Sequence, residues 1–210
     1  LVAAVAAAGV AAAPSQQDAA ADSSAALAHV TCASPELAQR VAEESGALPA
    51  LVAAVTAGGT TATPSLQDAA ANSAHVLSRF TSTSPALTEC VAEEPGVLPA
   101  LVAAVAAGST AATPSLKHAA ANSALALAHI TALVPEFAER VANEPGALPA
   151  LDGAVVAGGD AATPSLQGAA QNSAFVLDII TELGPECAGR VAEEPGALLA
   201  LVAIMAAGAT

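Results

Sequence analysis

The stretch LVAAV begins at Leu1 and returns as LVAAV at Leu51 and Leu101, as LDGAV at Leu151 and as LVAIM at Leu201. The spacing is 50 residues each time. A period of roughly 20–50 residues is typical of solenoids, whose units bury their apolar faces only by stacking on one another. The sequence therefore predicts a single array over 1–210, with repeats 1–50, 51–100, 101–150 and 151–200 and a partial repeat 201–210. Because it begins and ends at the same point of the repeat, we expect a fragment of a longer array.

The composition favours helices. Hydrophobic residues make up 54% of the chain but aromatic residues only 1%, so the core must consist mainly of Ala, Leu and Val. Alanine is the strongest helix former, and strands rich in aromatic and β-branched residues are absent from the sequence. We expect an all-α protein with closely approaching helices.

The charge argues against nucleic acid as a partner. The formal net charge is −14, from 19 acidic and 5 basic residues, and the bases form no stripe that could follow phosphates. No aromatic platform for stacking bases is present. A protein or peptide is the expected partner, and no cofactor or metal is expected. The sequence does not indicate an oligomeric state.

Residues 95–116 carry no charge, which raises the question of a membrane span. The stretch contains three prolines and much alanine, so it predicts two short buried helices and a loop instead. The cysteines Cys32, Cys90 and Cys187 lie at unequal repeat positions. Such a pattern indicates reduced thiols in an intracellular protein, cytoplasmic or nuclear.

Residues 84–131 predict three helices per repeat. Ser84 and Pro85 begin the first, which carries Leu87 and Val91 on one face and ends near Glu94. The second runs from Val97 to Ala107, with Gly108 as a left-handed C-cap. The third begins with Thr113 as N-cap and reaches about Thr131. Its expected buried side is Leu116, Ala120, Ser123, Ala124, Leu127 and Ile130.

The phrase PEFAERVANEPGALPALDGAV (135–155), followed by NSAFVLDIIT (172–181), resembles the armadillo repeat, and NSALALAHIT (122–131) is a second copy of the latter part. The resemblance recurs over the whole chain and implies a right-handed superhelical solenoid of three-helix repeats. At 50 residues the repeat is longer than usual. The surplus lies at 108–114, where we expect a longer loop along one edge.

The resemblance also implies a binding surface. In the family, the third helices line a concave groove, in which a Trp and an Asn four residues later hold extended peptides. The Trp positions correspond here to Ala25, His75, Leu125 and Phe175, and the Asn positions to His29, Arg79, His129 and Ile179. Because neither residue type is present there, we do not expect the capture of basic peptides that serves nuclear import.

A different polar row lies one turn earlier, at Asp22, Asn72, Asn122 and Asn172. An Asn amide offers donors and an acceptor that suit an extended peptide backbone. The candidate binding surface is therefore Asn72, His75, Arg79, Asn122, Leu125, His129, Asn172, Phe175 and Ile179. The alternative is that the Asn side chains only solvate the helix or bond to a neighbouring turn.

A second row is acidic: Glu43-Glu44, Glu93-Glu94, Asn143-Glu144 and Glu193-Glu194. It indicates either a solvated edge that keeps an apolar protein soluble or a docking edge for a basic partner. The four histidines and three cysteines show no metal-ligand spacing or nucleophile motif. We therefore expect no enzyme and no catalytic residues.

These patterns favour a non-enzymatic scaffold that binds an extended or helical peptide. Two alternatives stay open: the substrate-recruiting region of a larger regulatory protein such as a U-box-type ubiquitin ligase, and a structural spacer without a ligand. A contiguous apolar patch near Phe175 and Ile179 would favour a binding protein over a spacer.

Overall fold

A computed structural model describes residues 1–7, 12–111, 113–159 and 163–195. These residues form α-helices and contain no strand, which confirms the predicted all-α class. The helices fall into three kinds. The long helices are α2 (Pro14–Ala33), α5 (Pro64–Thr83), α8 (Pro114–Leu133) and α11 (Pro164–Glu182). The short helices are α3 (Pro35–Ala42), α6 (Pro85–Glu93), α9 (Pro135–Asn143) and α12 (Pro185–Glu193). The linking helices are α1 (Val2–Ala6), α4 (Ala47–Ala57), α7 (Val97–Thr110) and α10 (Ala147–Ala157).

Proline marks the start of the long and short helices, as the sequence predicted. Ser84 caps α6 by accepting a hydrogen bond from the Leu87 amide at 3.3 Å. A left-handed glycine separates α3, α6 and α9 from the linking helix that follows each of them, with φ of 81° at Gly46 and Gly96 and 80° at Gly146. This conformation costs glycine little, so the chain can turn sharply there.

The predicted C-cap at Gly108 is wrong. Helix α7 continues through Gly108 to Thr110, so part of the extra sequence lengthens the helix where we expected only loop. The glycine has a packing role instead. A Cβ atom at Gly108 would lie 2.2 Å from the Ala120 Cβ. At Gly58 and Gly158 it would lie 2.1 Å from the Cβ atoms of Ala70 and Ala170. Glycine thus allows the linking helix to approach the long helix closely.

The predicted N-caps of the long helices are only partly confirmed. The Thr63 hydroxyl accepts from the Leu66 amide at 3.4 Å, but Thr113 and Thr163 make no such bond. The hydroxyls of Thr63 and Thr113 also donate to the preceding copy, to Oε1 of Gln17 at 2.7 Å and to Oε1 of Gln67 at 3.0 Å. These threonines therefore join neighbouring copies.

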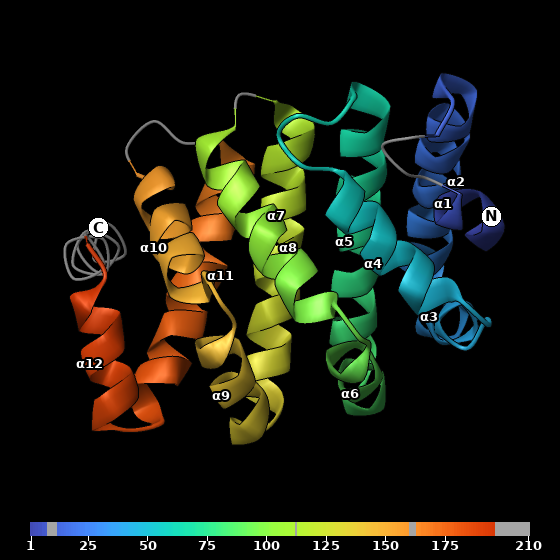
Figure 1. Ribbon diagram of the computed structural model, residues 1–210. Coiled ribbons are helices and arrows are strands. Elements are labelled where there is room, and N and C mark those ends of the chain that lie inside the picture. Colours follow the sequence, from blue (N-terminus) through green and yellow to red (C-terminus); the bar gives the residue numbers. More distant parts are fainter. Residues whose placement is uncertain (8–11, 112, 160–162, 196–210) are drawn as a thin grey trace.

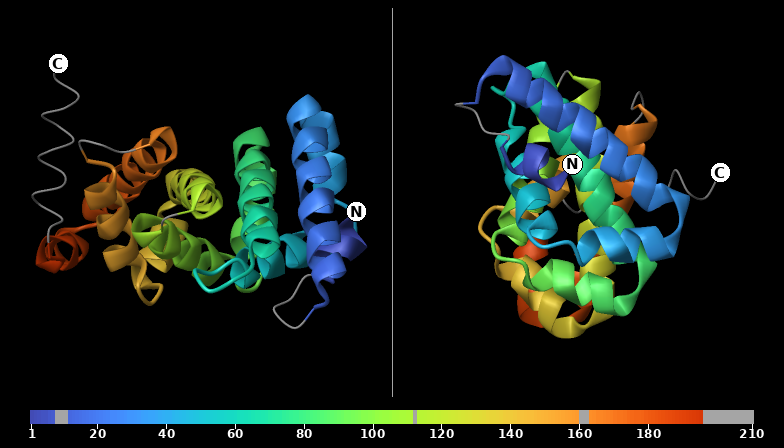
Figure 2. Two further views of the ribbon diagram at one scale, coloured as in Figure 1. Left: turned by 90° about the horizontal axis from the view of Figure 1, so that it is seen from above. Right: turned by 90° about the vertical axis from the view of Figure 1, so that its right-hand side faces the viewer.

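The copies follow one another along one direction. Each long helix packs against the next, α2 on α5, α5 on α8 and α8 on α11, so that the long helices form a row with α2 near one end and α11 near the other (Figures 1 and 2). The linking helices cover one side of the row. The core lies between these layers and consists mainly of Ala, Leu and Val.

The expected buried faces are confirmed. All six side chains predicted for the buried side of α8 are buried: Leu116, Ala120, Ser123, Ala124, Leu127 and Ile130. The same is true of Leu87 and Val91 in α6. Among the described residues, no single helix is long and apolar enough to cross a membrane. Helices α6 and α7 reach that length only together and are bent by 89°.

Candidate binding surface

The nine residues of the candidate binding surface lie on three successive long helices, α5, α8 and α11. Eight of them are half-buried, and Phe175 is 48% exposed. In each of these copies a half-buried asparagine is followed by a buried serine, at residues 73, 123 and 173. The long helices therefore place these residues at one register, at the boundary between core and solvent.

His75 lies between two other polar side chains, on either side along the row. Its Nε2 lies 3.1 Å from Sγ of Cys32 on α2, and its Nδ1 lies 3.4 Å from Oδ1 of Asn122 on α8. Because the Asn122 oxygen can only accept, Nδ1 carries the hydrogen and Nε2 accepts from the thiol. Cys32, His75 and Asn122 thus form a chain across three helices, which we call the Cys32 chain.

His129 makes a second contact between long helices. Its Nδ1 lies 3.0 Å from Oγ1 of Thr81 on α5, and the Thr81 hydroxyl donates to the Ser78 carbonyl at 3.0 Å. With the hydroxyl hydrogen used there, Nδ1 of His129 is the donor to Thr81. Burial lowers the pKa of the His129 imidazole, because the charged form loses solvation. His129 therefore connects α8 to α5, and its burial favours the neutral form of the ring.

These contacts bear on the alternative reading of the asparagines. Asn122 bonds to a neighbouring helix, as that reading expects, and both histidines serve the packing of long helices. Cys32 and Thr81 are hydrogen-bond partners of His75 and His129 that the sequence did not indicate. Their sequence separations from the histidines are 43 and 48 residues, close to but not equal to the repeat, so only stacked copies bring them together.

Arg79 presents an unused donor within this surface. Its Nε is buried and has no hydrogen-bond partner among the described residues. A buried donor without a partner is unfavourable, so this nitrogen costs the folded state some stability.

Two hollows lie along the row. One of about 310 Å³ brings together Asp22 and Asn72, neighbouring members of the polar row, with Asp68, Ser115 and His118 also lining it. The other, of about 570 Å³, lies between α8 and α11. Its lining includes the candidate residues Phe175 and Ile179 and the side chains Leu133, Val134, Asp178, Glu182 and Leu183. We call this second hollow the Phe175 patch.

The remaining candidate residues, Leu125 and Asn172, lie half-buried on α8 and α11 and do not line either hollow. The structure thus divides the nine residues. Asn72 lines one hollow. The side chains that connect neighbouring helices are His75, Asn122 and His129. The apolar surface is formed by Phe175 and Ile179.

The acidic row follows the ends of the short helices. Glu93, Glu94 and Glu144 line a hollow of about 380 Å³ with Arg140, and the next copy repeats it with Glu193, Glu194 and Arg190 in about 410 Å³. The arginines donate to backbone carbonyls there, so the carboxylates keep most of their charge exposed to solvent. The structure does not favour a basic partner over a solvated edge.

Within the described ranges, no three His, Cys, Asp or Glu side chains lie close enough to hold a metal ion. The Cys32 chain has a nucleophile, a base and a group that orients the base. Cys32 lines none of the hollows described above, however, and catalysis also needs a place for substrate and for developing charge. The absence of enzymatic activity stays a prediction.

No protein-family model, no curated protein and no solved structure matches this chain. The resemblance to armadillo repeats therefore rests on the residues quoted above.

Proposed function

We propose that this chain is a right-handed superhelical solenoid of armadillo-like repeats that serves as a non-enzymatic interaction scaffold and binds a peptide along its long helices. The observation that carries the proposal is the Phe175 patch. Phe175 and Val134 are exposed by 48% and 38%, and with Ile179 and Leu133 they line one hollow of about 570 Å³. A contiguous exposed apolar patch is typical of an interaction site, whereas a spacer has no need of one.

The chemistry of this patch suggests the class of ligand. Asp178 and Glu182 of α11 line the same hollow as the apolar side chains. A peptide with an apolar anchor next to Lys or Arg would fill the hollow and pair with the rim carboxylates. Upstream, the half-buried Asn72 amide would bond to its backbone.

The experiment is selection from a displayed library of random peptides on the immobilised chain, followed by measurement of Kd for the enriched sequences. The Phe175→Ser variant should weaken them by tenfold or more, because a buried aromatic anchor contributes about 2 kcal/mol or more. The matched control is Val156→Ser on α10, which removes another exposed apolar side chain, 58% exposed, away from the patch.

Failure to enrich any sequence, or an equal loss of binding in both variants, would contradict the proposal and favour a spacer. The role as substrate-recruiting region of a ubiquitin ligase stays a prediction, because no feature of the described residues bears on it.

A further inference from the structure

Cys32 and His75 form a pair of a nucleophile and a base at the junction of α2 and α5. Sγ of Cys32 lies 3.1 Å from Nε2 of His75, and Nδ1 of His75 lies 3.4 Å from Oδ1 of Asn122. The sulfur thus has a base within hydrogen-bond distance, and the base has an amide that orients its ring. This is the relation between groups that activates a nucleophile. Peptide binding at the Phe175 patch makes no use of Cys32.

The pair occurs at one of the three junctions between described long helices. The two positions are filled at the later junctions by Ser82 and Leu125, and by Ala132 and Phe175. Ala132 and Phe175 line the same hollow between α8 and α11, so the two positions lie close together there as well. The register of the stacked copies therefore brings these positions together, and only the sequence at the first junction fills them with a thiol and an imidazole.

Cys32 is exposed to solvent. Its equivalents Ser82 and Ala132, in copies that have another copy on either side, are exposed too. The exposure therefore follows from the position on the long helix and does not depend on the place of the copy in the row. A small molecule can reach the sulfur directly from solvent.

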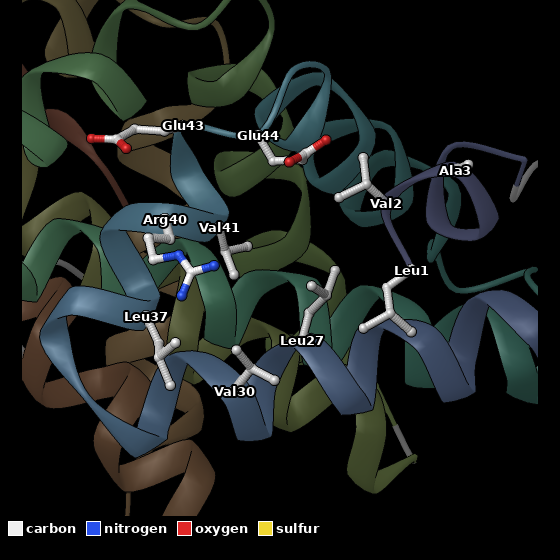
Figure 3. Close-up of a pocket in the computed structure, with 10 residues that line it drawn as sticks. All are labelled: Leu1, Val2, Ala3, Leu27, Val30, Leu37, Arg40, Val41, Glu43 and Glu44. Carbon is white, nitrogen blue, oxygen red and sulfur yellow. The ribbon is translucent and has the colours of Figure 1, made fainter.

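The side chains just before Cys32 point elsewhere. Leu27 and Val30 of α2 line a hollow of about 730 Å³ between α2 and α3 (Figure 3). Two residues turn a helix by about 200°, so Cys32 lies on the opposite side of α2 from Val30 and contacts α5. The sulfur lines none of the hollows described here, and no cavity next to it selects a particular molecule. Such a site suits a reagent that carries its own reactive bond.

We propose that Cys32 is a site of reversible modification by a small-molecule disulfide, with His75 as the general base. Sγ of Cys32 attacks one sulfur of the disulfide, and the thiol proton passes to Nε2 of His75. A new sulfur–sulfur bond forms, the bond of the small disulfide breaks, and the departing sulfur takes the proton from His75 and leaves as a thiol. Cys32 is thereby oxidised to a mixed disulfide and half of the reagent is reduced, so no other oxidant is required.

Asn122 has a positioning role in this step. Its side-chain oxygen accepts from Nδ1 of His75, which leaves the lone pair of Nε2 directed at the sulfur. The same oxygen stabilises the positive charge of the ring while His75 holds the proton. An excess of small thiol reverses the modification, because its attack on the mixed disulfide returns Cys32 as a free thiol.

Reaction of the 210-residue chain with glutathione disulfide tests the proposal. Samples stopped with acid at timed intervals and analysed by peptide mass spectrometry give the rate at every thiol at once. Cys32 should form the mixed disulfide about tenfold faster than Cys90 or more, because a positioned general base commonly accelerates a step about a hundredfold or more. Cys90 is the internal control, since it is also exposed and no hydrogen bond joins it to a histidine within the described ranges. Excess reduced glutathione should then remove the group from Cys32.

Two variants separate catalysis by His75 from a merely structural contact. In His75→Gln the amide oxygen can still accept the thiol hydrogen but does not act as a base, so the rate at Cys32 should fall to that of Cys90. Asn122→Ala should lower the rate at Cys32 by a smaller factor. His118→Gln is the matched control, because it removes an exposed histidine of α8 that makes no contact with a thiol among the described residues, and it should leave the rate unchanged.

Three results would overturn the proposal. They are equal rates at Cys32 and Cys90 in the unsubstituted chain, a rate at Cys32 that His75→Gln does not lower, and an equal loss in His75→Gln and His118→Gln. The first comparison needs no variant, so it holds even if a substitution loosens the fold. The proposal does not depend on the Phe175 patch, which lies two junctions further along the row.

Discussion

His75 and His129 show how single polar residues are used in a chain made mostly of Ala, Leu and Val. Each lies in the candidate binding surface, and each bonds to a neighbouring long helix. A half-buried polar side chain at this boundary satisfies its hydrogen bonds within the protein and still presents part of itself to solvent. Substitution of His129 or Asn122 would therefore change helix packing as well as any ligand contact.

The Cys32 chain predicts unequal reactivity among the thiols. The Cys32 Sγ lies 3.1 Å from Nε2 of His75, which is placed to accept the thiol hydrogen as a general base while the sulfur attacks a reagent. We expect iodoacetamide to alkylate Cys32 faster than Cys90, which is also exposed, near neutral pH. His75→Ala should bring the two rates together. Peptide mass spectrometry after timed alkylation measures both sites in one sample, and equal rates in the unsubstituted protein would contradict the prediction.

Asp152 replaces the valine of the other copies, Val52 and Val102, on a linking helix. The side chain is only 6% exposed, and its Oδ1 has no hydrogen-bond partner among the described residues. Burial, and secondarily the charge of Glu194, raise the pKa of this carboxyl. Its ionised form is therefore disfavoured in the folded state.

Because the folded-state pKa is above the unfolded value, the folded state binds more protons between the two. The carboxyl thus lowers stability as the pH rises through its raised pKa. We expect Asp152→Val to raise the free energy of unfolding at neutral pH by about 1–3 kcal/mol. The gain should shrink as the pH falls below the raised pKa. Denaturant titrations of both proteins across acid and neutral pH measure it, and a difference independent of pH would refute the assignment.

At the scale of the element, the glycines of the linking helices limit how the layers pack. A methyl group at Gly108 would lie 2.2 Å from the Ala120 Cβ and 2.6 Å from the Leu116 carbonyl oxygen, both on α8. Backbone cannot move as a flexible side chain can, so α7 and α8 would have to separate.

Gly108→Ala should therefore destabilise the protein by about 1–3 kcal/mol, the usual cost of overpacking, although alanine is the better helix former. Gly168→Ala in α11 is the matched control. A Cβ there meets nothing within 4 Å, so the substitution should stabilise by up to about 1 kcal/mol. Thermal unfolding followed by circular dichroism distinguishes the two, and a shift in the same direction for both would show that the close approach is not decisive.

At the scale of the whole molecule, charge opposes the compact state. The net charge is −14, and the ends of successive short helices bring carboxylates of neighbouring copies into the same hollows. Like charges repel less when salt screens them, with a screening length of about 10 Å at 0.1 M.

We expect the melting temperature to rise between low and physiological ionic strength. Glu93→Gln with Glu94→Gln should raise it at low salt and reduce the increment that salt provides. Scanning calorimetry at a series of salt concentrations measures both effects. A melting temperature that is constant or falls with salt would mean that repulsion within the acidic row does not destabilise the folded state.

The sequence alone determined the helices and their buried faces. Proline marked the starts of the long and short helices, and the spacing of Leu, Val and Ala predicted the buried side of α8. These are local properties, because helix start signals and apolar periodicity act over a few residues of one chain segment. The 50-residue period also indicated that the same unit recurs.

The tertiary structure alone decided what those units do to one another. The partners of His75 and His129 are 43 to 48 residues away, and Gly108 has its role because Ala120 of α8 lies against it. Such contacts depend on the distance and rotation between stacked copies, which the pattern within one copy does not specify.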